Sequence, residues 1–305
     1  MAAYLTVRMM HSLIAMIGLV LAVFFMARMT GNPSALYLPV EASQQMIDEF
    51  SRANGFDDPL LVQFGRFLSG VAHFDLGDSL RQNRPAIDVI LEAYPVTLKL
   101  SALAMALALA IAIITGALAA WNPDGVFDRI ATILSLFGAS APNFWIAVVG
   151  VLIFSVTLQW LPTSGLGGPL SWVLPVTVLA MRPCGLLVQV VRGSMITALS
   201  SDYVKTARAK GASRRAIIFV HSLRNAMLPV ITVAGDQIAG MVNGAVIVET
   251  VFGFPGIGKL LIDSIGYRDF AVVQAAVLVS AGVIFLINLL VDLTYALLDP
   301  RIRMT

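Results

Sequence analysis

Six long apolar runs constrain the fold of this chain more than any other feature. They cover residues 9–27, 96–120, 130–161, 172–191, 230–248 and 271–298. A helix needs about 20 residues to cross a hydrocarbon core of about 30 Å, and each run is close to that length or longer. Charged residues are 12% of the chain, about half the share in an ordinary soluble domain. The sequence therefore predicts an all-α integral membrane protein with six transmembrane helices.

The third and the first apolar runs differ from simple transmembrane helices. The third is overlong and contains Pro142, which predicts a kink or a broken turn. The first has a basic start, but no small-residue cleavage pair follows Arg28, so we expect a retained span. We therefore divide the chain into an N-terminal segment with the first span (1–29), an external segment (30–95) and a five-helix core (96–305) that includes a cytoplasmic loop at 200–229.

Basic residues beside the short loops set the expected orientation. If the spans alternate, eleven of them fall on one side, which the positive-inside rule assigns to the cytoplasm. They are Arg8, Arg129, Arg192, Lys205, Arg208, Lys210, Arg214, Arg215, Arg224, Arg301 and Arg303. We expect both termini to lie in the cytoplasm. Residues 44–50 and 60–68 of the external segment show helical spacing of apolar positions and predict two short amphipathic helices.

The basic segment 202–229 lies between the fourth and fifth runs. Ser200, Ser201 and Asp202 can cap a helix, residues 203–210 favour one, and Gly211 suits a left-handed turn that ends it. By pattern alone, this segment is equally well explained as a solvated cytoplasmic loop. If it serves as a docking helix, Ala207 is expected on the docking face, where a small side chain permits close approach.

Few polar residues lie inside the runs. They are Arg182, Asp236, Gln237, Asn243, Asn288 and Asp292. Charges are costly in a bilayer, so such residues mark either functional sites or hydrogen bonds between helices. Helix-to-helix hydrogen bonding is the favoured role of Asn288 and Asp292. For Arg182 and Asp236 we predict that the two side chains face each other.

Other chemistries find little support. His11, His73 and His221 are scattered, and Cys184 is the one cysteine, so neither a metal site, a disulfide nor a histidine-assisted nucleophile is indicated. Basic residues are not interleaved with aromatic ones, which argues against nucleic-acid binding. Gly253 and Gly258-Lys259 have the spacing of a phosphate-binding loop, but Leu260 replaces the required Ser or Thr. We therefore expect a turn at the outer mouth of a pore.

The stretch Thr206-Ala207-Arg208-Ala209-Lys210-Gly211, with Leu228-Pro229, resembles the EAA signature loop of ABC transporter membrane subunits. Lys205 stands in place of the usual Glu, and Gly211 precedes Pro229 by eighteen residues. Both departures resemble the peptide and nickel branch of the family. So do three further stretches, which extend the resemblance over nearly the whole chain. They are Gly55-Phe56-Asp57-Asp58-Pro59, Asp75-Leu76-Gly77-Asp78-Ser79 and the segment from Val248 to Lys259.

This resemblance implies the first (B-type) permease subunit of a dipeptide, oligopeptide or nickel importer, with the type I importer fold. It implies a second homologous permease, two ATP-binding subunits that hold ATP and Mg²⁺, and an external substrate-binding protein, with no cofactor in this chain. The implied coupling residues are Asp202, Tyr203, Ala207, Arg208, Ala209, Lys210 and Gly211. Those of an external loop near the binding protein are Phe254, Pro255, Gly256 and Gly258, and those of the pore are Arg182, Asp236, Gln237 and Asn243.

A self-sufficient secondary transporter is the alternative. It would couple to protons through Asp236 or Asp292 and would usually show inverted internal repeats. No such repeat is visible in the sequence, whereas a cytoplasmic docking helix is predicted. The cargo could be a dipeptide, a longer peptide, an opine, glutathione or a nickel chelate, since its selection rests largely with the binding protein.

Overall fold

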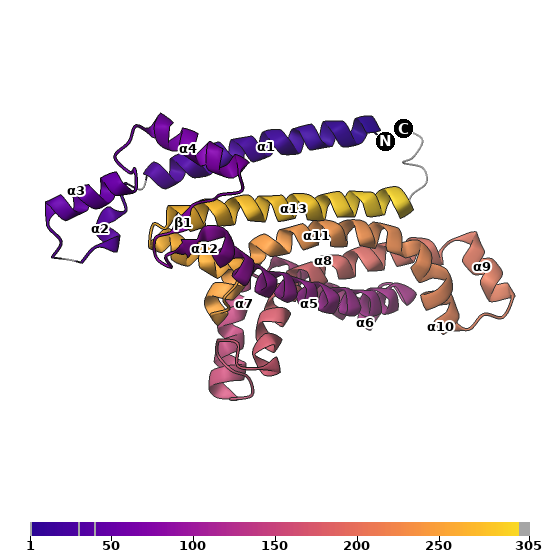
Figure 1. The fold of residues 1–305 in the computed structure, drawn as a ribbon. Coiled ribbons are helices and arrows are strands. Elements are labelled where there is room, and N and C mark those ends of the chain that lie inside the picture. Colours follow the sequence, from indigo (N-terminus) through magenta and orange to yellow (C-terminus); the bar gives the residue numbers. More distant parts are fainter. Residues whose placement is uncertain (1, 30, 40, 299–305) are drawn as a thin grey trace. The chain divides into compact units, whose positions relative to one another are not determined.

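The computed structural model describes residues 2–29, 31–39 and 41–298, and this part of the chain is largely helical (Figure 1). It forms two compact units. Unit 1 consists of the described residues of Met1–Val96 and Pro255–Phe285, and unit 2 of those of Thr97–Phe254 and Leu286–Thr305. Helices α5 and α13 each contribute to both units, which are described separately below.

Unit 1 contains the N-terminal helix and the polar segment that follows it. Its elements are α1 (Ala2–Met29), α2 (Ser34–Tyr37), α3 (Gln44–Ala53), α4 (Leu60–Ala72), β1 (Asp78–Ser79), β2 (Arg84–Pro85), the start of α5 (Ala86–Trp121), α12 (Ile257–Gly266) and the start of α13 (Phe270–Leu298). The two short amphipathic helices predicted in the external segment are confirmed as α3 and α4. Helix α3 begins where the Ser43 hydroxyl accepts a hydrogen bond from the Met46 amide (3.3 Å).

Two apolar clusters hold unit 1 together. Phe24 of α1 is fully buried against Phe64 and Phe67 of α4, with ring centroids 5.1 and 5.5 Å away. The second cluster joins α5, α12 and α13, and its buried members are Ala86, Val89, Ile90, Tyr94, Ile257, Val272, Ala275 and Ala276. The aromatic contacts therefore attach the polar segment to the end of an apolar helix.

Unit 2 contains the remaining helices. They are the rest of α5, α6 (Val126–Ser140), α7 (Asn143–Gly150), the π-helix η1 (Val151–Thr157), the 3₁₀ turn η2 (Pro169–Trp172), α8 (Val173–Leu199), α9 (Asp202–Ala209), α10 (Arg214–Ala216), the π-helix η3 (Ile217–Ser222), α11 (Leu223–Phe252) and the end of α13. Helix α8 packs against both α6 and α11. The sequence pattern did not predict either π-helix.

The helices bear out a multi-pass membrane fold. Four helical stretches are long and apolar enough to cross a bilayer: Ala86–Trp121, Pro169–Leu199, Arg214–Val242 and Phe270–Val291. The number rises to six if two bent pairs each count as one span. The break predicted at Pro142 is confirmed, because Val126–Ser140 and Asn143–Thr157 meet at 104°. In α1 the apolar stretch found is the shorter Ile14–Met26, so the first span stays a prediction.

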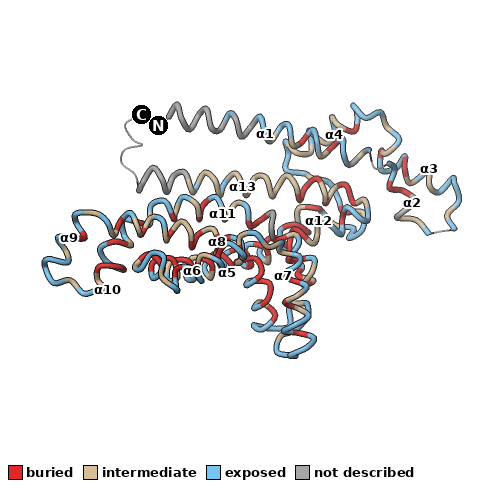
Figure 2. Tube along the Cα trace, turned by 180° about the vertical axis from the view of Figure 1, so that it is seen from behind, coloured by how far each residue is buried: buried red, intermediate tan, exposed pale blue. Residues whose placement is uncertain are grey.

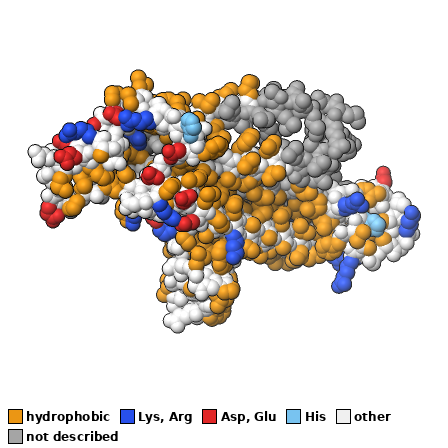
Figure 3. Space-filling view, in the orientation of Figure 1, with side chains coloured by type: hydrophobic (Ala, Val, Ile, Leu, Met, Phe, Trp, Pro, Cys, Tyr) orange, Lys and Arg blue, Asp and Glu red, His pale blue; other side chains and the backbone are white. Residues whose placement is uncertain are grey.

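The surface of unit 2 is apolar, as expected for a membrane protein. Apolar side chains such as Ile114, Ile133 and Leu134 are more than half exposed, and exposed positions recur along the long helices (Figure 2). Figure 3 shows hydrophobic side chains over the helical body and Lys and Arg gathered around α9 and α10. An apolar belt of this kind is the surface that lipid or another membrane subunit covers.

Candidate functional site: a basic helix and the elements that hold it

Helix α9 is the predicted cytoplasmic helix, and its position in the chain is confirmed. It covers Asp202–Ala209, and Gly211 has a φ of +81°. The chain therefore turns through a left-handed conformation that glycine adopts without strain. Ser201 occupies the N-cap position, but its hydroxyl donates back to the Ala198 carbonyl (2.5 Å). Ser201 thus ties α9 to the end of α8 instead of capping the first amides of α9.

One face of α9 is attached to its own chain and the other is free. Val204 is completely buried and Ala207 is half-buried where α9 packs against η3. The opposite face is exposed, and it carries Asp202, Lys205, Thr206 and Ala209. Lys205 and Asp202 form an exposed ion pair of 2.8 Å on this face. The half-buried position of Ala207 places it toward the anchored side, and the small exposed residue is Ala209.

Trp121, the last residue of α5, contacts arginines at the end of α9 and in α10. The Arg208 guanidinium carbon lies 5.6 Å from its ring centroid, and that of Arg214 in α10 lies 4.6 Å away. Both distances are within the range of cation–π attraction. One indole ring therefore contacts the helix before Gly211 and the helix after it. These two partners lie far from Trp121 in the sequence, so no local pattern reveals them.

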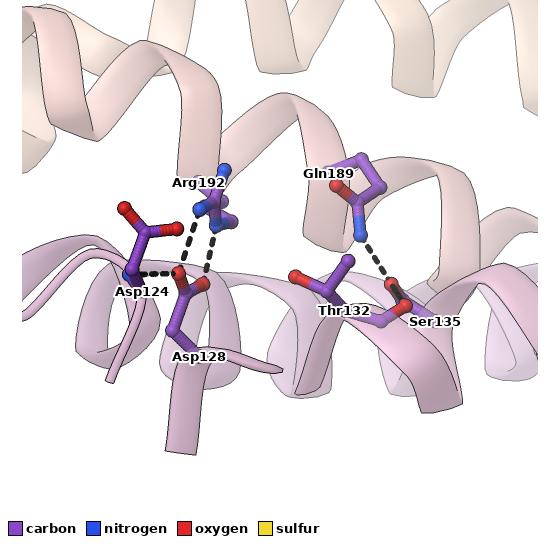
Figure 4. Close-up of polar contacts among 6 residues, drawn as sticks. All are labelled: Asp124, Asp128, Thr132, Ser135, Gln189 and Arg192. Atoms are coloured by element: carbon purple, nitrogen blue, oxygen red, sulfur yellow. Dashed lines mark hydrogen bonds and ion pairs between the residues drawn. The ribbon is translucent and has the colours of Figure 1, made fainter. Parts of the chain in front are cut away.

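The polar network of Figure 4 fixes the helix that leads into α9. Arg192 of α8 makes a two-pronged ion pair with Asp128 of α6, with Arg192 Nη2 2.6 Å from Asp128 Oδ2. The Asp124 amide donates to the same carboxylate (2.8 Å). Asp128 is only 2% exposed. The sequence pattern does not reveal this pair, because Arg192 appears in it as one more basic residue beside a loop.

A second contact between α6 and α8 lies two turns of α6 further on. Gln189 of α8 donates to the Ser135 hydroxyl of α6, which donates to the Thr132 carbonyl (2.8 Å). Gly185 of α8 lies so close to α6 that a Cβ there would overlap the Ser135 carbonyl oxygen. Close backbone approach and hydrogen bonds are the usual means of joining helices inside a bilayer. Helices α6 and α8 are therefore held together along one seam.

The predicted pairing of Arg182 with Asp236 is wrong for this chain. Arg182 in α8 and Asp236 in α11 both lie in the described part, and no ion pair joins them there. Each is exposed, and the Asp236 carboxylate accepts instead from the neighbouring Gln237 amide (3.2 Å). Both residues lie inside apolar runs, but a position within a run does not fix the direction in which its side chain points. Exposed charges inside a bilayer still require a polar neighbour outside this chain or water.

The other polar residues of the spans are only partly resolved by the structure. Asn288 is half-buried on α13, whereas the side chains of Asn243 and Asp292 fall outside the described residues. A buried acidic residue escaped the sequence analysis. Glu249 of α11 is fully buried, and its carboxylate accepts from the Thr97 hydroxyl of α5 (2.5 Å). Its position at the end of an apolar run resembles that of a loop residue, so no signal in the sequence singled it out.

The glycine-rich segment after α11 forms a turn. Gly253 has a φ of +64° and ends α11. Phe254 is fully buried, and its ring makes a T-shaped contact with that of Trp172, with the ring centroids 5.0 Å apart. Gly256 is the N-cap of α12, where Pro255 is exposed and Gly258 is buried. Lys259 forms an ion pair with Asp263 (2.6 Å). In the described part of the chain, no three His, Cys, Asp or Glu residues cluster as a metal site would require.

Helices joined by hydrogen bonds, apolar outer surfaces and a basic helix exposed at one end are the features of a multi-pass membrane protein with a polar surface outside the bilayer. Residues 94–304 match the family described as "Binding-protein-dependent transport system inner membrane component". The chain therefore belongs to this family and is a permease subunit of an ABC transporter. Membership of this family leaves no support for the alternative of a self-sufficient secondary transporter.

Relatives match almost the whole chain. It is 34% identical to the dipeptide transport system permease protein DppB of Alkalihalophilus pseudofirmus, over 99% of this chain and 100% of that protein. It is 36% identical to the oligopeptide transport system permease protein AppB of Bacillus subtilis, over 99% and 100%. The glutathione transport system permease protein GsiC of Escherichia coli is 37% identical, over 93% of both chains.

Solved transporters share the fold. The inward-facing MetNI methionine ABC transporter superposes with a TM-score of 0.58 at 17% identity, over 70% of this chain and 97% of that one. An amino acid ABC transporter solved with histidines gives 0.52 at 19% identity, over 77% and 98%. The predicted fold class of ABC importer permeases is thereby confirmed.

Proposed function

We propose that α9 is the helix through which this permease receives work from an ATP-binding subunit. The observation that carries the proposal is the division of α9 into a face anchored by Val204 and a free face with Asp202, Lys205, Thr206 and Ala209. A helix that is packed against its own chain on one face can transmit a force that a partner applies to the opposite face. The ties from α9 to Ala198, Trp121 and η3 connect that force to the spanning helices.

The chain itself performs no hydrolysis in this proposal. ATP and Mg²⁺ belong to two partner ATP-binding subunits, and a second homologous permease completes the pore. An external substrate-binding protein delivers the cargo to the face where we place residues 30–95 and the turn at Phe254, Pro255, Gly256 and Gly258. Both termini then lie in the bacterial cytoplasm. The names of the relatives support a peptide or a related small solute as the cargo.

Arg182 and Asp236 support the second permease. Both are exposed in this chain, and each lies in a helical stretch long and apolar enough to cross a bilayer. A charge facing lipid at the centre of a bilayer costs roughly 2.5 to 3.5 kcal/mol. We infer that these residues, together with Gln237 and Asn243, face a pore that the second subunit closes.

ATP turnover of the reconstituted transporter tests the role of α9. Ala209→Glu places a larger, charged side chain on the free face, and Gly211→Val forces a β-branched residue into a positive φ. In each variant, the ATPase activity stimulated by the loaded binding protein should fall at least tenfold. Docking of the binding protein should persist.

Two substitutions provide matched controls. Ala53→Glu changes an exposed alanine at the end of α3, and Gly167→Val changes an exposed loop glycine with open space around it. Both should retain stimulated turnover. Normal turnover in the two α9 variants, or ATP hydrolysis by this chain alone, would contradict the proposal.

A further inference from the structure

Unit 1 contains a cavity that is lined by residues with no individual role in the proposed function. Its volume is 360 Å³, at the lower end of the range of about 300–1,000 Å³ for small-molecule sites. The end of α1, the loop before α4, α4 itself, residues 75–80 and the start of α13 line it. It therefore lies where the apolar stretch Ile14–Met26 of α1 gives way to a polar segment.

Two side chains that line this cavity have hydrogen-bond donors without acceptors. Arg28 donates through Nε to the Gln63 side chain (2.6 Å), but its Nη1 is buried and has no partner. Gln274, only 4% exposed, likewise has an unpartnered Nε2. Buried donors are normally satisfied, and leaving one unsatisfied costs about 1–3 kcal/mol. A guanidinium and an amide with free donors on one cavity fit an acceptor such as a phosphate.

The guanidinium is held in place by aromatic rings. Its central carbon lies 5.1 Å from the Phe24 ring centroid and 4.8 Å from that of Phe270. Arg28 is thus fixed between α1 and α13 before any ligand arrives. A side chain that is already ordered loses less conformational entropy on binding.

Acidic side chains on the same cavity limit the ligand. Asp75, Asp78 and Asp269 line it, as does Arg66, which is already paired with Asp58 (2.6 Å). Asp269 accepts from the Ser79 hydroxyl (2.6 Å) and Asp75 accepts from the Gly77 amide (3.0 Å). Three carboxylates repel a simple anion, but they attract a ligand that carries an ammonium group beside its phosphate. The charges therefore favour a zwitterion.

Exposed apolar side chains on the same helices indicate where such a ligand comes from. Met26 and Met29 of α1 are 67% and 85% exposed, and Leu61 of α4 is 80% exposed. Helix α4 lies against α1 through Phe24 and Phe64. Side chains of this kind at the end of an apolar helix suit the boundary between headgroups and acyl chains.

We propose that this cavity binds the headgroup of a phospholipid with a primary amine, phosphatidylethanolamine. Arg28 and Gln274 receive the phosphate, Asp75 and Asp78 receive the ammonium group, and the acyl chains lie along the exposed apolar side chains of α1 and α4. The ammonium must carry N–H donors, because the carboxylates accept hydrogen bonds. A trimethylated headgroup or an anionic glycerol headgroup fits the same cavity less well.

Native mass spectrometry tests the proposal on the full-length chain, purified in detergent with whatever subunits remain bound. Defined phosphatidylethanolamine, phosphatidylcholine and phosphatidylglycerol are added in turn, and soluble phosphoethanolamine serves as the headgroup without its chains. We expect phosphatidylethanolamine to bind at least tenfold more tightly than each of the other three. Equal binding of the three lipids would overturn the proposal, and phosphoethanolamine binding as tightly as the lipid would overturn its membrane source.

Variants locate the site. Arg28→Gln should abolish the preference, whereas Arg52→Gln, which changes an exposed arginine of α3 outside the cavity, should keep it. The double change Asp75→Asn with Asp78→Asn leaves the arginine in place and removes two negative charges. It should weaken phosphatidylethanolamine binding and strengthen that of phosphatidylglycerol. An unchanged lipid preference in this double variant would contradict the assignment even if Arg28→Gln fails to fold.

Discussion

Arg192 of α8 forms a bidentate ion pair with Asp128 of α6, with Arg192 Nη2 2.6 Å from Asp128 Oδ2. Arg192 lies ten residues before the start of α9. Asp128 also accepts from the Asp124 amide, so the pair fixes a loop as well as two helices. If α9 receives a force from a partner, as we propose, this pair connects the end of α8 to α6. In the proposed function, α9 would thereby act on two helices, α8 and α6.

Asp128→Asn should destabilise the permease by about 3 kcal/mol, because it leaves the Arg192 guanidinium without its charged partner. The thermal midpoint of the detergent-purified chain measures this loss. Arg129→Gln is the matched control, since Arg129 is the exposed neighbour on the same helix. Adding Arg192→Gln to Asp128→Asn should recover part of the loss. Purely additive losses would show that the two residues act independently.

Gly185→Ala should destabilise the seam between α6 and α8 by about 1–3 kcal/mol, because the added methyl group overlaps the α6 backbone. Gly193→Ala, eight residues further along α8, has open space around it. The same change there should stabilise the helix by about 1 kcal/mol. Opposite shifts of the thermal midpoint are expected, and equal shifts would contradict the close approach of the two helices.

Trp121→Leu should loosen α9 without unfolding the spans. Each cation–π contact at an exposed site contributes about 0.5–1 kcal/mol, and this substitution removes the contacts to both Arg208 and Arg214. Amide hydrogen exchange in residues 202–216 should accelerate severalfold, with little change in α8. Trp121→Phe keeps an aromatic face and should lie between wild type and Trp121→Leu. Unchanged amide exchange in both variants would show that Trp121 does not stabilise α9.

Membrane sidedness follows from placing α9 in the cytoplasm. In a Cys184→Ser background, Ser69→Cys on the exposed surface of α4 should react with an impermeant thiol reagent in intact cells. Ser213→Cys, just before α10, should react only after the membrane is opened. The reverse pattern would invert the topology.

Local chemistry made the helices and their ends predictable. The turn at Gly211 and the break at Pro142 each depend on residues close in sequence. Contacts such as those of Asp128 with Arg192 and of Trp121 with Arg208 join residues far apart in the chain. No periodicity encodes these. The mistaken pairing of Arg182 with Asp236 has the same origin, because depth in the bilayer is readable from sequence whereas the direction of a side chain is not.

Photo-crosslinking from position 206 tests the central claim most directly. A benzophenone amino acid in place of Thr206 lies on the free face of α9, and the matched probe at Val204 lies on the buried face. We predict that irradiation of whole cells joins position 206 to an ATP-binding subunit, identified by mass spectrometry, whereas position 204 crosslinks only within this chain. Crosslinks from position 206 to lipid or to this chain alone would contradict the claim that α9 is the docking helix.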